Sequence, residues 1–181
     1  KRVACFGEEY LRCKEPGRFG TSTLRHTWNN PETAQQALSV LDALNWHGLA
    51  HMDLIQDKNG VFKIIEINPR PWGAIALAVK AGVDFPWLWY QVATGQQTEI
   101  LPNPKDIHCR WLLGECMAAV ERIKHGRFKE FANILKIHPG CRHDDFSIRD
   151  PLPLIFEMLD YMAKFIRSGG STNPVIENMV R

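Results

Sequence analysis

Residues 49–68 read LAHMDLIQDKNGVFKIIEIN, and they form two apolar runs joined at the dipeptide Asn59-Gly60. Asn and Gly both tolerate the positive φ of a two-residue type I′ turn, so the stretch predicts a β-hairpin. With that turn, Asp53 lies directly opposite Glu66. Paired side chains of an antiparallel ladder point to the same face, with Cβ atoms about 5 Å apart.

The same pairing places His51 opposite Asn68, so four polar side chains gather on one face of the predicted hairpin. A four-residue turn from Asp57 to Gly60 would change the partners but keep all four on that face. An odd-length loop or a bulge would break the pattern.

Two facing carboxylates repel each other, which predicts a cation between Asp53 and Glu66. Carboxylate and amide oxygens are hard ligands, and Mg²⁺ is usually held by one or two carboxylates together with substrate phosphates. We therefore expect Asp53, Glu66 and Asn68 to hold Mg²⁺. The alternative is a solvated hairpin with its polar face outward, which is common in one-sided antiparallel sheets.

The composition indicates a soluble, globular domain. Hydrophobic residues make up 45% and charged residues 23% of the 181 residues, and the net charge of +2 comes without a basic stripe for nucleic acid. Five irregularly spaced cysteines are typical of reduced thiols, and no apolar run reaches the ~20 residues of a membrane span. We expect a cytoplasmic protein, and because the chain begins at Lys1, a piece of a longer polypeptide.

The order of predicted elements indicates an α+β fold with a mostly antiparallel sheet and flanking helices. The expected elements are a strand over 2–6, a helix capped by Asn30 and ended by Gly48, the hairpin, and helices over 72–80 and 86–94. After the proline-spaced segment 101–104, amphipathic patterns predict a small helical appendage. Its helices are expected over 109–125, 127–136 and 151–167, followed by a flexible tail over 168–174.

Five spaced motifs resemble the C-terminal lobe of an ATP-grasp enzyme, closest to carbamoyl-phosphate-synthetase-like carboxylate–amine ligases. They are GLAHMD at 48–53, DKNG at 57–60, IEINPR at 65–70, Trp72-Gly73, and AGVD at 81–84. The resemblance implies that residues 1–100 are this lobe and that residues 101–181 are the helical appendage. It also implies ATP and Mg²⁺, with Mn²⁺ as a substitute, and a ligase that activates a carboxylate as an acyl-phosphate for attack by an amine.

The resemblance assigns roles position by position. Asp53, Glu66 and Asn68 would hold the metal against the ATP phosphates, which are the ligands that the hairpin geometry selects. Arg70 would act at the γ-phosphate or the acyl-phosphate as the catalytic residue. Nucleotide contacts would come from Asn68, from Arg25 on an earlier strand, and from His51, where relatives can carry arginine.

The lysines and the glycine-rich loop of the family's first lobe are not identifiable in this sequence. We therefore expect the chain by itself to bind nucleotide weakly and to be inactive. A second class is a non-catalytic nucleotide-binding or subunit-interaction domain of the same fold, but the intact acidic pair favours the ligase. The aromatic helices after residue 85 would permit a homo-oligomer.

Overall fold

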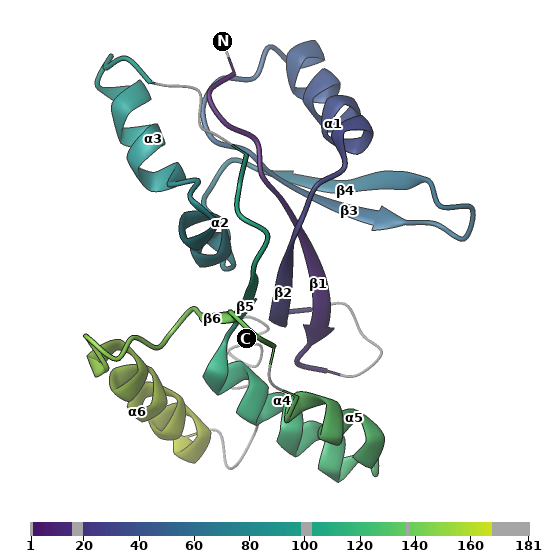
Figure 1. The fold of residues 1–181 in the computed structure, drawn as a ribbon, viewed down its shortest axis with the longest axis vertical. Coiled ribbons are helices and arrows are strands. Elements are labelled where there is room, and N and C mark those ends of the chain that lie inside the picture. Colours follow the sequence, from purple (N-terminus) through teal and green to yellow (C-terminus); the bar gives the residue numbers. More distant parts are fainter. Residues whose placement is uncertain (1, 16–19, 99–102, 137, 168–181) are drawn as a thin grey trace. The chain divides into compact units, whose positions relative to one another are not determined.

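The computed structural model describes residues 2–15, 20–98, 103–136 and 138–167 (Figure 1). Strands and helices are interspersed along the chain, the sheet pairing is mixed but mostly antiparallel, and the described residues contain six helices. The predicted α+β fold is confirmed. No helix among the described residues is long and apolar enough to cross a membrane.

The chain divides into two compact units, Lys1–Glu9 with His26–His108, and Tyr10–Arg25 with Cys109–Arg181. The sequence predicts a different kind of division, into an ATP-grasp lobe over residues 1–100 and a helical appendage over residues 101–181. That division stays a prediction.

The first unit is built around a two-stranded antiparallel hairpin and three helices. Its elements are α1 (Pro31–Ala43), β3 (His51–Gln56), β4 (Phe62–Asn68), α2 (Ile75–Ala81) and α3 (Phe85–Ala93). A core cluster of Trp72, Ala74 and Ala78 is packed by Phe6, Leu49, Ile75 and Phe85.

Helix α1 begins as predicted, because the Asn30 side chain accepts a hydrogen bond from the Thr33 N–H at 3.0 Å and Pro31 occupies the first turn. It ends at Ala43, five residues before the predicted stop at Gly48. Asn45 adopts a positive φ of 50°, and the segment that follows leads into β3.

The expected strand over residues 2–6 is wrong, since the first strand is β1 (Gly7–Cys13). Phe6, at the end of this apolar segment, packs against the core cluster and is not part of a strand. Gly7 opens the strand in a place where a Cβ would lie 2.6 Å from the Trp28 carbonyl oxygen. The strand therefore depends on close pairing, which the charged sequence GEEYLRC does not reveal.

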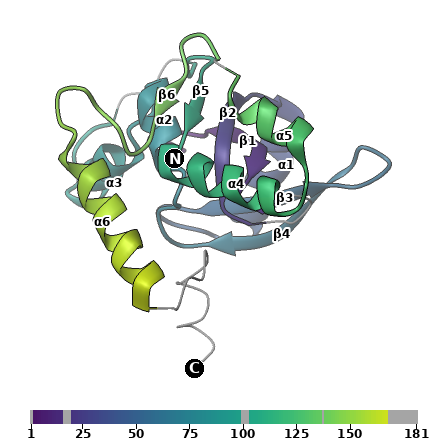
Figure 2. The same ribbon diagram turned by 90° about the horizontal axis from the view of Figure 1, so that it is seen from below.

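The second unit contains the larger part of a four-stranded sheet in the order β1-β2-β5-β6. The remaining strands are β2 (Ser22–Trp28), β5 (His108–Arg110) and β6 (Arg142–His143), and β5 and β6 are parallel. Three helices follow the predicted ranges closely, namely α4 (Leu112–Lys124), α5 (Phe128–Ile134) and α6 (Leu152–Arg167). Figure 2 shows α4 beside α5. The predicted tail over 168–174 lies outside the described residues.

Candidate active site

The turn of the hairpin is a five-residue loop from Asp57 to Val61, because Gln56 pairs with Phe62. The predicted two-residue turn is wrong, and so is the four-residue alternative. The loop is organised by Asp57, whose Oδ1 accepts the N–H groups of Asn59 at 2.8 Å and Val61 at 3.1 Å. A charged side chain thus satisfies backbone donors that a tight turn would pair differently.

A β-bulge corrects the register between this loop and the polar cluster. Leu54 pairs with Ile64, whereas Asp53 pairs with Glu66, so Ile65 is the extra residue on β4. If the ladder ran on from the loop without interruption, Ile65 would lie opposite Asp53, and Glu66 would belong to the other face. The odd loop and the bulge therefore compensate each other.

The pairing that the sequence predicts at the open end is confirmed, with Asp53 opposite Glu66 and His51 opposite Asn68. The Asn68 amide donates to Glu66 Oε1 at 2.7 Å, and His51 Nε2 lies 3.6 Å from Asp53 Oδ1. The four side chains form one connected group.

The Asp53 and Glu66 carboxyl groups lie close enough to affect each other's pKa. Burial raises the pKa of Asp53, and the hydrogen bond with Glu66 acts in the same direction. Hydrogen bonds from Asn68 and from Asp53 lower the pKa of Glu66. Two carboxylates and an amide oxygen that share one face of the hairpin are hard oxygen donors, so this donor set fits Mg²⁺.

His51 is positioned by an aromatic stack. Its ring lies parallel to the Trp72 indole, with centroids 5.3 Å apart and an interplanar angle of 6°, and Trp72 packs edge-on against Phe85. Burial lowers the pKa of His51, so the imidazole is neutral at pH 7. Its Nδ1 and the Trp72 Nε1 are buried and have no hydrogen-bond partner among the described residues. His51, which is predicted to contact the nucleotide, can therefore offer a hydrogen bond but not the positive charge of an arginine.

Trp72 is a site residue to which the sequence reasoning gave no role. The signal was its place two residues after Arg70, in the turn that leads from the second strand to the next helix.

Arg70 lies on the surface directly after β4. Its Nη1 donates to the Pro71 carbonyl at 3.2 Å, and its charge acts on the pKa values of His51, Asp53 and Glu66. Arg70 therefore lies within electrostatic range of the acidic pair, and its predicted catalytic role stays a prediction.

Arg25 belongs to the second unit, on β2. Its side chain is 3% exposed and forms an ion pair with Asp144, whose other carboxylate oxygen lies 2.9 Å from the Cys109 thiol. This guanidinium already has a buried counter-charge, and its predicted nucleotide contact stays a prediction.

Within the described part of the chain, no three His, Cys, Asp or Glu side chains are grouped as metal ligands. The predicted magnesium ligands are not a group of this kind, because the third ligand is the amide oxygen of Asn68. The assignment of Asp53, Glu66 and Asn68 to a metal stays a prediction.

No curated protein and no solved structure matches the chain. One family model, described as "ATP-grasp in the biosynthetic pathway with Ter operon", matches residues 3–114. This range includes the whole hairpin, Arg70 and the Trp72 stack. ATP-grasp families have an ATP-dependent ligase-type fold and typically use ATP and Mg²⁺. Since the match covers more than half of the 181 residues, the chain belongs to the ATP-grasp family of the biosynthetic pathway with the Ter operon.

Proposed function

We propose that this chain supplies the metal-binding wall of an ATP- and Mg²⁺-dependent ligase that joins a carboxylate to an amine. The observation that carries the proposal is the facing pair Asp53 and Glu66, with Asn68 hydrogen-bonded to Glu66, in a chain of an ATP-grasp family. Opposed carboxylates destabilise a hairpin when nothing lies between them, so their presence calls for a cation. Mn²⁺ accepts the same oxygen donors as Mg²⁺.

The chemistry needs charge neutralisation. A carboxylate is a poor electrophile, and its attack on the γ-phosphorus of ATP brings two anions together. The metal, when bound, lowers this repulsion by sharing charge with the phosphate oxygens. The carboxylate oxygen then bonds to phosphorus and ADP leaves, and an amine attacks the resulting acyl-phosphate and displaces phosphate to form the C–N bond.

The chain's own side chains divide the remaining tasks. Asn68 holds Glu66 in place through the 2.7 Å hydrogen bond, which orients one ligand oxygen. Arg70 carries its positive charge on an exposed side chain next to the acidic pair, where it can approach a phosphoryl group. Neutral His51, held flat against Trp72, can donate a hydrogen bond to a phosphate oxygen without adding charge.

The proposal is tested with Glu66→Ala in the full-length protein. Phosphate and ADP release from Mg²⁺-ATP is measured with a panel of carboxylates and amines. We expect turnover to fall by about 10²-fold or more, because the variant loses a metal ligand and the partner of Asp53. Glu66 is exposed, so circular dichroism should show an intact fold.

Glu32→Gln is the matched control, because it removes one exposed carboxylate from the first turn of α1 in the same unit. Its turnover should equal that of the wild type. Wild-type rates in Glu66→Ala would refute the ligase site. ATP binding without any turnover in the wild type would instead identify a non-catalytic nucleotide-binding or subunit-interaction domain.

A further inference from the structure

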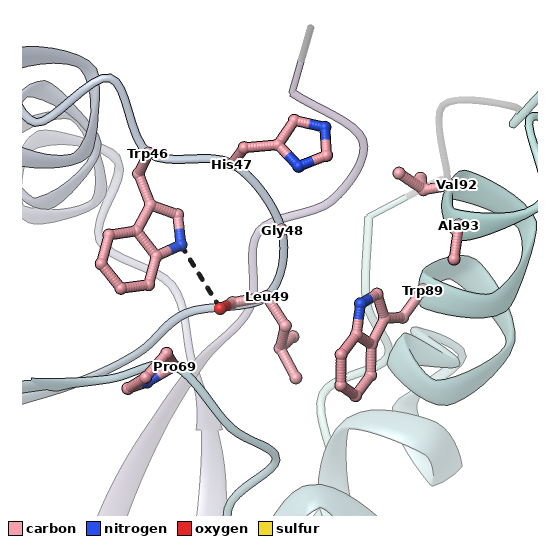
Figure 3. Close-up of a pocket in the computed structure, with 8 residues that line it drawn as sticks. All are labelled: Trp46, His47, Gly48, Leu49, Pro69, Trp89, Val92 and Ala93. Atoms are coloured by element: carbon pink, nitrogen blue, oxygen red, sulfur yellow. Dashed lines mark hydrogen bonds between the residues drawn. The ribbon is translucent and has the colours of Figure 1, made fainter.

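A pocket of about 230 Å³ lies within the first unit, beside the residues that enter and leave the hairpin (Figure 3). Its walls come from the segment before β3, from Pro69 after β4, and from the last turns of α3. Figure 3 shows Trp46 and Pro69 on one side of Leu49, and the Trp89 indole on the other. The pocket therefore lies between the segment before β3 and helix α3, and none of its lining residues belongs to the predicted metal or nucleotide ligands.

The lining is apolar and aromatic. Leu49, Pro69, Val92 and Ala93 supply aliphatic surface, and Trp46 and Trp89 supply two rings. The Trp46 indole N–H is already used, since it donates to the Leu49 carbonyl at 3.3 Å, and this bond holds the ring as a wall. His47 is the one titratable side chain of the lining. Such a surface favours an uncharged, ring-bearing group over a phosphate or a carboxylate.

Two chain segments connect residues of the pocket lining with residues of the candidate active site. Leu49 precedes His51 by two residues, about 7 Å in an extended chain, and Pro69 stands between Asn68 and Arg70. The two regions also share a contact, because Leu49 packs on the cluster that contains Trp72, and Trp72 stacks on His51. A small molecule can thus place one end at Arg70 and the other in the pocket.

We propose that this pocket binds an apolar, ring-bearing side chain of the carboxylate that the ligase activates. The inference rests on the proposed function, and it names the substrate class of that site. An apolar cavity of about 150 Å³ is large enough for benzene, so this pocket has room for one ring and its linker. A short spacer between the ring and the carboxyl group is expected, because Leu49 precedes His51 by only two residues.

Trp89 offers a sharp test, because the same helix carries a matched control. Trp89 lines the pocket and is 45% exposed, whereas Trp87 is 52% exposed, stacks on Tyr90 and is not part of the lining. Both residues can be changed to Ala with similar loss of ring surface. Ala93→Leu, which fills the pocket from the last turn of α3, is a second variant that removes no existing contact.

The probe is 3-phenylpropionate, and its binding to the full-length protein is followed by ligand-observed NMR without nucleotide. We expect Trp89→Ala and Ala93→Leu to weaken binding about tenfold or more, and Trp87→Ala to change it less than about twofold. Equal binding by Trp89→Ala and wild type would overturn the inference. Displacement of the probe by adenosine would also overturn it, because the pocket would then be a base site.

Turnover separates this inference from the proposed function. Phosphate release from Mg²⁺-ATP is compared for 3-phenylpropionate and acetate, each with the same amine. A higher kcat/KM for 3-phenylpropionate, lost in Trp89→Ala, supports both. Equal kcat/KM values would overturn the pocket assignment and leave the ligase intact. If no carboxylate is used, the proposed ligase fails, and the binding experiment still decides the pocket.

Discussion

Asp57 organises the hairpin turn through its charge. It accepts two backbone N–H groups and lies 3.0 Å from the Lys63 ammonium. The hydrogen bond from Lys63, followed by those from the backbone, lowers the pKa of Asp57 below its ordinary 3.8. A carboxylate whose pKa is lowered by folding adds stability above its unfolded pKa, and this contribution disappears as the pH falls through the folded pKa.

We therefore expect Asp57→Asn to melt a few degrees below the wild type at pH 7, and the difference to shrink as the pH falls below about 3.8. Thermal unfolding at a series of pH values measures it. Lys63→Ala leaves the backbone hydrogen bonds in place and should give a smaller decrease. A variant as stable as the wild type at neutral pH would mean that the charge does not support the turn.

Several residues of the site could be predicted because their grouping depends on simple alternation. His51, Asp53, Glu66 and Asn68 are spaced by two along each strand, so any pairing that preserves this alternation brings them together. The role of Trp72 could not be predicted in the same way. It lies beyond the strand, and its stack on His51 depends on the turn that leads into α2.

The pairing of Asp53 with Glu66 was predicted correctly, although the predicted turn and the predicted regular ladder are both wrong. The predicted tight turn is replaced by a five-residue loop, and the predicted regular ladder contains a bulge at Ile65. Each irregularity alone would separate Asp53 from Glu66. Sequence alternation reports which residues must share a face, but the path by which the backbone achieves this depends on local hydrogen bonds such as those of Asp57.

The bulge on β4 predicts different outcomes for two changes of chain length, a deletion on β4 and an insertion on β3. Deletion of Ile65 removes the extra residue, so Asp53 and Glu66 stay paired on their present face. Insertion of one threonine after Asp53 also gives a regular ladder, but it turns both carboxylates to the opposite face relative to Leu54 and Ile64. We expect the insertion to abolish ATP-dependent phosphate release and the deletion to retain part of it.

Both variants are assayed in the full-length protein, and circular dichroism confirms the strand content. Activity in the insertion variant equal to that in the deletion variant would show that the face of the hairpin does not matter for the reaction.

The start of a helix was predictable where a capping signal exists, whereas the stop signal Gly48 did not mark the end of α1. The Asn30 cap and Pro31 fixed the start of α1, and α4 to α6 follow their amphipathic patterns. The short strands β5 and β6, of three and two residues, could not be predicted. A strand of that length carries no periodicity, and it exists because a neighbouring strand supplies its hydrogen bonds.

At the level of the whole molecule, each unit has its own buried interactions. In the second unit Glu115 is 4% exposed, forms an ion pair with Arg12, and lies 3.7 Å from Arg110 Nε. Removal of the Glu115 carboxylate would leave two partly buried arginines without this counter-charge.

The expected cytoplasmic location and the expected homo-oligomer stay predictions.

We expect Glu115→Ala to lower the free energy of unfolding by about 3 kcal/mol, since an uncompensated buried charge is costly. Urea unfolding measures the loss, and hydrogen exchange locates it. Amides of α4 should exchange faster, while those of β3 and β4 should keep the wild-type rate. Lys129→Ala, an exposed change on α5, should alter neither. Equal acceleration in β3 would show that the two units unfold together.

The bulge at Ile65 also affects how the protein can change by mutation. The face occupied by Asp53 and Glu66 is set by the number of residues between them, whereas the identity of each ligand is set by single codons. Point substitutions can therefore exchange the atoms offered to a cation, but they leave the face unchanged. Lining residues such as Trp89 and Ala93 carry no such constraint, so a new substrate preference can evolve there while the acidic pair stays in place.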